Sequence, residues 1–245
     1  MQSVLEETIE NITRERVSVL GSGRTDAGAH ALAQVIAFSS SSTLPTQVIR
    51  RALNATLPRD IAVTDVFEVG ERFHPRFDAE SRTYRYVIFN RRAPSPFWHL
   101  RAAHVKHRLD EAAMNTAVSY LVGSHDFAAF VPVAQAGDSV RTVYDAACHR
   151  EDDVIAIDLR ASGFKQQMVR TIAGTLVQVG AQRLRPDDMT EILRSRDRKR
   201  AGDTMPACGL YLVAVRYPAG TLGERTSGDL GPGAAHLFHG YEEKA

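Results

Sequence analysis

Hydrophobic residues recur along the chain with two spacings, which predict helices and strands in alternation. Spacings of three and four residues predict helices at 4–12, 46–57, 110–121, 168–179 and 187–196. Alternating or continuous apolar runs predict strands at 17–20, 30–38, 61–69, 82–89, 139–149, 154–161 and 210–217. Ser3 is the expected N-cap of the first helix, and Pro58 ends the second. The last strand is almost continuously apolar, which favours a central place in a sheet.

The order of these elements predicts an α+β chain of two similar halves, because helix and strands are followed by helix and strands again. Two prolines in residues 91–96 indicate a junction. We therefore expect an N-terminal half at 1–96 and a C-terminal half at 97–218. Residues 219–245 contain six glycines without periodic apolar positions, which predicts a flexible tail.

Composition excludes several protein classes. With 44% hydrophobic and 24% charged residues, the 245-residue chain can bury a real core, unlike a disordered tail, a coiled coil or a fibre. No apolar run reaches the roughly 20 residues that span a bilayer, and the start lacks the pattern of a secretory signal. We expect a cytoplasmic protein. Cys148 and Cys208 are far apart and lack metal-ligand spacing, so no disulfide or zinc site is expected.

Basic residues are unevenly distributed, although the net charge is only +1. Arginine, which grips phosphate with a planar fork, supplies 26 of the 30 basic residues. Residues 71–108 carry nine Arg or Lys against three Asp or Glu. Aromatic residues are interleaved with them: Tyr84, Tyr86, Phe89, Phe97 and Trp98. This stretch alone is equally typical of RNA binding and of a solvated strand face beside core aromatics.

The loop at residues 23–28 is the most informative stretch for chemistry. Gly23 and Gly28 bracket Arg24, Thr25 and Asp26 between two expected strands. Glycines permit tight backbone turns, which would present the Asp26 carboxylate from a rigid base. On spacing alone, an Asx-turn that only satisfies nearby amides explains the pattern as well.

Six further short motifs follow this loop along the chain. They are Asn54 to Ile61, Phe73 to Phe77, Arg82 to Tyr86, Gly123 to Phe127, Phe164 with Met168 to Arg170, and Gly209 to Leu212. Together with Gly23 to Gly28 and His30 to Val35, this order resembles the tRNA pseudouridine synthase A family over residues 2 to 218. The resemblance implies a pseudouridine synthase fold, with a largely antiparallel sheet flanked by helices and an active-site cleft between the halves.

The resemblance also implies an activity, the isomerisation of uridine to pseudouridine at positions 38 to 40 in the anticodon stem-loop of tRNA. Such enzymes act as homodimers, so tRNA and a second copy are the expected partners. The reaction breaks a glycosidic bond, turns the uracil and rejoins it through carbon. Since no redox change occurs, no cofactor and no metal are expected.

Residues are assigned to this chemistry by resemblance. Asp26 would be the nucleophile and Arg170 the cation paired with it, which offsets the cost of burying a carboxylate. Helical phase places Arg170 away from the apolar stripe of its helix, as it would also place an ordinary surface arginine. Tyr84 would pack on the target base and serve the proton transfer at C5. Its alternative role is that of a core tyrosine.

Binding residues follow in the same way. Leu210 would line the pocket of the base, and Arg24 would hold the flipped nucleotide, since a stacked base cannot react. Arg76 and Arg92 match positions that contact tRNA, and phosphate contact is the expected role of each.

The chain also departs from the family, which begins with a strand and a Tyr-Asp-Gly segment ahead of the helix that starts here near Ser3. We expect either a start assigned too far downstream or a truncated chain. One alternative function is therefore a catalytically inactive tRNA-binding protein of the same fold, because a lost strand exposes a sheet edge. A second alternative is a nucleoside hydrolase that uses the same aspartate and releases free uracil.

Overall fold

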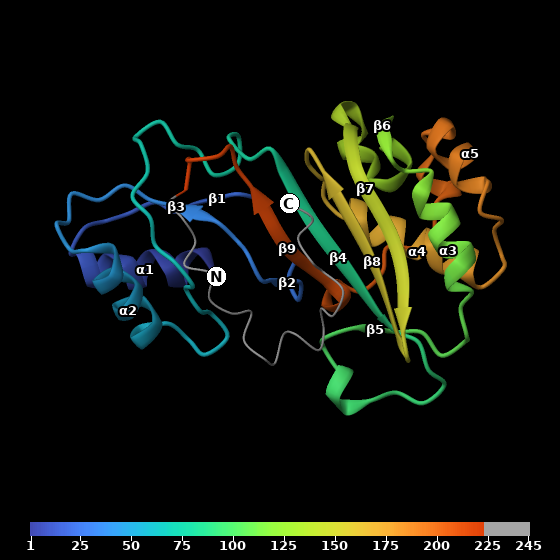
Figure 1. Cartoon of the computed structure of the whole chain (residues 1–245), viewed down its shortest axis with the longest axis horizontal. Coiled ribbons are helices and arrows are strands. Elements are labelled where there is room, and N and C mark those ends of the chain that lie inside the picture. Colours follow the sequence, from blue (N-terminus) through green and yellow to red (C-terminus); the bar gives the residue numbers. More distant parts are fainter. Residues whose placement is uncertain (223–245) are drawn as a thin grey trace. The chain divides into compact units, whose positions relative to one another are not determined.

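The structure is a computed structural model that describes residues 1–222 (Figure 1). Its helices are α1 (Gln2–Thr13), α2 (Thr46–Thr56), α3 (Glu111–Ser119), α4 (Met168–Gly180) and α5 (Asp188–Ser195). Its strands are β1 (Leu20–Gly21), β2 (His30–Ala31), β3 (Ile36–Ala37), β4 (Ser81–Phe89), β5 (Ala103–His104), β6 (Gly123–Asp126), β7 (Val140–Glu151), β8 (Val154–Ala161) and β9 (Leu210–Arg216). None of the helices within residues 1–222 has the length and apolar character of a membrane span.

Two compact units make up the described chain. The first contains residues 1–19 and 38–73, with 219–222, and the second contains 20–37 and 74–218. In the first unit α1 packs against α2. Leu5 and Ile9 of α1 are buried there, as are Ile49 and Leu53 of α2. The apolar spacing that predicts both helices thus corresponds to the faces they bury.

The second unit is built on a seven-stranded sheet in the order β2-β9-β4-β8-β7-β6, with β5 paired to the end of β4. Most pairs are antiparallel, whereas β2 with β9 and β5 with β4 are parallel. The fold is therefore α+β with a mixed, mainly antiparallel sheet, as expected. The apolar run at 210–217 forms β9, which lies between two other strands, as its composition predicts.

Three helices lie on one side of this sheet, where α3 packs against β7, α4 against β4 and α5 against β6 (Figure 1). Tyr86 and Ile157 of the sheet and Met168 and Ile172 of α4 are fully buried in the resulting core. Each large apolar side chain buried in this way stabilises the fold by about 1.5–3 kcal/mol. Because α4 lies in the middle of this core, its N-terminal turn is a rigid base for Arg170.

Four local expectations were wrong. The strand expected at 17–20 begins only at Leu20, since β1 is Leu20–Gly21. Ser3 lies inside α1 and does not cap it, since the helix already begins at Gln2. The run at 30–38 is split into β2 and β3, because its first part joins β9 and its last part pairs with β1. Residues 61–69 form no strand. Their polar backbone groups bond instead to side chains of α2, where Asn54 binds Val63 and Arg50 binds Thr64.

The expected halves at 1–96 and 97–218 stay a prediction, and residues 91–95 form the connection after β4. The expected flexible tail at 219–245 falls outside the described residues from 223 onward.

Candidate active site

The loop that carries Asp26 is anchored at its base by three side-chain contacts. The Ser22 hydroxyl donates to Gln34 Oε1 (2.6 Å), and Gln34 Nε2 donates to the Gly23 carbonyl (2.8 Å). The Arg82 guanidinium donates to the Ser22 carbonyl through Nε (3.2 Å) and Nη2 (3.0 Å). Arg82 also bonds to the carbonyls of Arg76 and Ser162, so one cation ties three segments together.

Beyond this base the chain turns sharply at Asp26. The amide of Ala29 donates to the Asp26 carbonyl (3.0 Å), and Gly28 adopts φ +83°. Since that region is open mainly to glycine, Gly28 allows the turn that presents the Asp26 side chain. The carboxylate is 23% exposed.

Asp26 and Arg170 meet in this structure although 144 residues separate them. Nη1 of Arg170 donates to Oδ2 of Asp26 at 2.5 Å, and the Arg170 side chain is 16% exposed. A second donor, Nε of Arg170, binds the Met205 carbonyl at 2.7 Å. Within residues 1–222, Oδ1 of Asp26 makes no hydrogen bond. The pair therefore leaves one carboxylate oxygen available to a substrate.

Tyr84 lies on β4 close to this carboxylate. Burial raises the pKa of Tyr84, the cation of Arg82 lowers it, and the charge of Asp26 raises it. The phenol therefore remains protonated at neutral pH. Its ring packs edge-on against Phe164, with centroids 5.1 Å apart. The pairing of β4 with β9 shifts register between Thr83 and Tyr84, and such irregularities re-aim side chains beside functional sites.

The other predicted residues lie in different surroundings. Leu210 is buried at the start of β9, opposite Tyr86. Arg24, Arg76 and Arg92 are exposed. The Arg76 guanidinium lies 5.7 Å from the centre of the Phe77 ring. Arg24 and Arg92 make no ion pair or hydrogen bond through their side chains within the described part of the chain.

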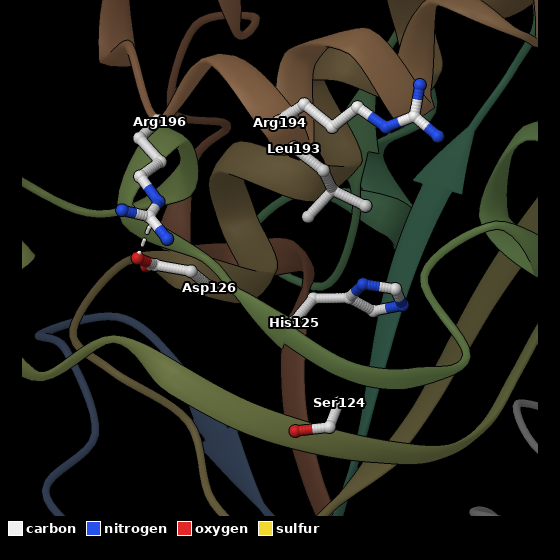
Figure 2. A pocket seen from close by; sticks show the side chains of 6 residues that line it. All are labelled: Ser124, His125, Asp126, Leu193, Arg194 and Arg196. Atoms are coloured by element: carbon white, nitrogen blue, oxygen red, sulfur yellow. Dashed lines mark ion pairs between the residues drawn. The ribbon is translucent and has the colours of Figure 1, made fainter.

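A pocket of about 400 Å³ lies elsewhere in the second unit, between β6 and α5. Figure 2 shows Arg196 directed at Asp126, its partner at 2.9 Å, while Arg194 extends away from that pair. A second pocket, of about 520 Å³, is lined by residues around Arg108 and Arg150. Neither contains Asp26, Arg170, Tyr84 or Leu210. We place the candidate site at the Asp26–Arg170 pair because cation, carboxylate and tyrosine come together there.

Sequence reasoning assigned no role to Arg82 and Gln34, which hold the Asp26 loop in place. Both stand inside motifs that carry the resemblance, Arg82 to Tyr86 and His30 to Val35. Their membership of those motifs was the available signal, but only the structure shows that their partners are carbonyls of the loop.

Comparison with known proteins identifies the family of the chain. A family profile described as tRNA pseudouridine synthase matches residues 1–78 and 117–218. The chain belongs to this family. It is 44% identical over 218 residues to tRNA pseudouridine synthase A of Acetivibrio thermocellus, covering 89% of each chain. It is 41% identical to tRNA pseudouridine synthase A of Caldicellulosiruptor bescii, with the same coverage. It is 43% identical over 222 residues to tRNA pseudouridine synthase A of Roseiflexus castenholzii, and the match covers 89% of this chain and 82% of the relative.

Membership of the tRNA pseudouridine synthase family makes this chain an isomerase that acts on tRNA. All the residues assigned to the site, from Arg24 to Leu210, lie in the second compact unit, at 20–37 and 74–218. The contacts that build the Asp26–Arg170 pair therefore come from this unit alone.

Proposed function

We propose that this enzyme converts uridine to pseudouridine at positions 38 to 40 in the anticodon stem-loop of tRNA, with Asp26 as the nucleophile. The observation that carries the proposal is the asymmetry of the Asp26 carboxylate. Arg170 binds Oδ2, while Oδ1 has no hydrogen-bond partner in the described chain. An ionised carboxylate with one free oxygen suits attack on an electrophilic carbon of the nucleotide.

The surroundings of Asp26 support the remaining steps. Arg170 keeps a compensating positive charge beside the carboxylate whenever the substrate displaces water. Tyr84, whose phenol is protonated, would stack on the uracil and donate a hydrogen bond to it. To accept the proton from C5, Tyr84 would have to pass its own proton onward, because its raised pKa disfavours the phenolate. Leu210 would supply an apolar wall for the base.

Binding of the tRNA is assigned to exposed arginines. Arg24, next to the catalytic loop, would stabilise the flipped nucleotide, and Arg76 and Arg92 would contact phosphates. A homodimer, which rests on the family resemblance, and the cytoplasmic location expected from the sequence are part of the same proposal. The alternative of an inactive tRNA-binding protein finds no support in the site, since Asp26, Arg170 and Tyr84 are all present and the ion pair is formed. A nucleoside hydrolase would use the same aspartate, so the product of the reaction separates that alternative from the isomerase.

The test is tritium release from tRNA transcripts that carry uridine labelled at C5. We expect release from a transcript with uridine at positions 38 to 40 and none from a matched transcript with cytidine there. Nuclease digestion and chromatography of the product should show pseudouridine retained in the RNA. Free uracil in the filtrate would instead indicate hydrolysis, and binding without release of tritium or uracil would contradict the activity.

A further inference from the structure

The segment from Gly202 to Pro206 is held by hydrogen bonds at four of its five residues. The Gly202 amide donates to Thr175 Oγ1 (2.8 Å), and the Gly202 carbonyl accepts from Arg198 Nη1 (3.0 Å). The Pro206 carbonyl accepts from the Tyr86 hydroxyl (2.6 Å). Burial raises the pKa of Tyr86, so this donor keeps its proton. An extended segment outside any helix or strand is thus fixed at both ends.

Close packing against α4 restricts the same segment further. A Cβ added to Gly174 would lie 1.9 Å from the Asp203 carbonyl oxygen, and one added to Gly202 would lie 2.5 Å from the Gly174 carbonyl carbon. Backbone meets backbone here, so neither side can shift without breaking the contact. Residues 202 and 203 therefore lie in direct backbone contact with α4 at Gly174.

Arg198 joins this segment to the interior of α4. Its Nη2 donates to Thr204 Oγ1 (3.1 Å), which lies 3.1 Å from Thr171 Oγ1. The Thr171 side chain belongs to a fully buried residue of α4, one position after Arg170. Arg198 thus binds the Gly202 carbonyl and the Thr204 hydroxyl at once, on both sides of Asp203.

The end of this chain of contacts is the Arg170 guanidinium. The Met205 amide donates to the Arg170 carbonyl (3.2 Å), and Arg170 Nε donates back to the Met205 carbonyl (2.7 Å). Since a guanidinium is planar, fixing Nε fixes the direction of Nη1, the atom that binds Asp26. The position of the Met205 carbonyl consequently sets where the cation of the site lies.

We propose that Arg198 is a positioning residue of the isomerase, which acts through Thr204 and the Met205 carbonyl to hold Arg170 against Asp26. This inference rests on the proposed function of the Asp26–Arg170 pair. It predicts that loss of Arg198 changes the chemical step and leaves tRNA binding unchanged, because Arg198 reaches the site only through Arg170.

The experiment is a double-mutant cycle between Arg198→Ala and Arg170→Lys, with kcat, KM for a tRNA transcript and thermal unfolding measured for each variant. Small displacements of reacting groups reduce rates by up to about a hundredfold. We expect Arg198→Ala to lower kcat about tenfold and to leave KM within about twofold. In the Arg170→Lys background, Arg198→Ala should lower kcat no further, since the connection is already broken.

Control variants separate positioning from a loss of fold. Arg200→Ala removes the neighbouring cation, whose side chain binds Glu191 (3.3 Å), and should leave kcat unchanged. Thr204→Val removes one hydroxyl at constant shape and should reproduce the kcat loss, whereas Thr204→Ser should restore the rate. If Arg198→Ala unfolds, the same cycle is measured with Thr204→Val.

Each remaining outcome has one meaning. Full activity of Arg170→Lys would overturn the proposed function of the pair. A reduced rate for Arg170→Lys together with an unchanged kcat for Arg198→Ala, or with multiplicative losses in the double variant, would overturn only the role of Arg198. A rise in KM without a change in kcat would show that Arg198 serves tRNA binding, and it would also overturn the inference.

Discussion

The two partners of the ion pair are held in very different ways. Arg170 lies in the first turn of α4, between the buried residues Val169 and Thr171. Its guanidinium is held by a hydrogen bond to the Met205 carbonyl. Asp26 lies in a turn outside any strand, and its side chain bonds only to Arg170 within residues 1–222. The loop is anchored below Asp26, through Ser22 and Gly23, and not at the carboxylate itself.

This difference shows how a site can be rigid and reactive at once. Every hydrogen bond that a carboxylate oxygen accepts stabilises its charge and lowers its tendency to attack. Placing the geometric restraint on the cation leaves the attacking oxygen free, while the pair still has a defined position. Arg170 on α4 is thus the partner with the fixed position, and Asp26 in the loop is the nucleophile.

The sharpest test of this contrast is Asp26→Asn, which preserves shape and removes the charge. We expect the rate of tritium release to fall at least about a thousandfold, because the step that needs a carboxylate nucleophile is lost. Affinity for tRNA should remain within about twofold, since phosphate contacts supply most of it. Activity equal to that of the unmodified enzyme would refute the assignment of Asp26.

The second test compares the stability of two variants, each with one glycine replaced by alanine. Gly174 lies in α4 with Arg170, and Gly23 lies in the loop of Asp26. Gly174→Ala drives a methyl group into the Asp203 carbonyl, whereas a Cβ at Gly23 meets no atom within 4 Å. We expect Gly174→Ala to lower the free energy of unfolding by about 2–4 kcal/mol and Gly23→Ala by less than about 1 kcal/mol. Urea unfolding followed by circular dichroism measures both, and equal losses would contradict the difference in packing.

The third test compares a paired cation with unpaired ones. Arg170 is neutralised by Asp26, whereas Arg92 has no ion pair within the described chain and is proposed to bind phosphate. Arg76→Ala and Arg92→Ala should each weaken binding of many tRNAs alike. The slope of log Kd against log salt concentration should decrease by about one for each. An unchanged slope would exclude these arginines as phosphate contacts.

The smallest effect concerns Tyr84. Burial raises the pKa of its phenol above the ordinary value of 10.0, and Asp26 contributes in the same direction. The folded protein therefore loses stability as pH rises above about 10, because the unfolded chain ionises first. Asp26→Asn removes the negative charge and should lower the pKa of Tyr84. Absorbance titration near 295 nm measures ionisation of the tyrosines in Asp26→Asn, and the double variant Asp26→Asn/Tyr84→Phe identifies the part that belongs to Tyr84. A pKa of Tyr84 that is higher in Asp26→Asn than in the unmodified enzyme would contradict the proximity of the two side chains.

Long periodic segments were predictable from the sequence because their patterns correspond to buried faces. This holds for α2, α4, β4, β8 and β9, whose apolar positions pack as the spacing indicates. The expected strand at 61–69 failed because its backbone bonds to Asn54 and Arg50 and not to another strand, a choice that apolar content does not reveal.

The site was predictable only in part. Helical phase places Arg170 off the core stripe, but its contact with a residue 144 positions away came from family resemblance. Arg198 and Thr204 escaped notice because Arg198 lies in a single turn of 3-10 helix and Thr204 lies in a segment without regular structure. Neither is long enough for a periodic pattern to mark a contact. Arg82 was inside a recognised motif, yet its acceptors are backbone carbonyls, and carbonyls carry no sequence signature.

Arg82 also affects the order in which the molecule acquires its structure. Two of the carbonyls it binds, those of Ser22 and Ser162, lie 60 and 80 residues away along the chain. Contacts of such separation close late in folding, after local helices and hairpins such as β7–β8 have formed. During refolding, catalytic competence should therefore return after the far-ultraviolet circular dichroism signal, since the loop of Asp26 gains its anchor only when distant segments have been assembled around one side chain.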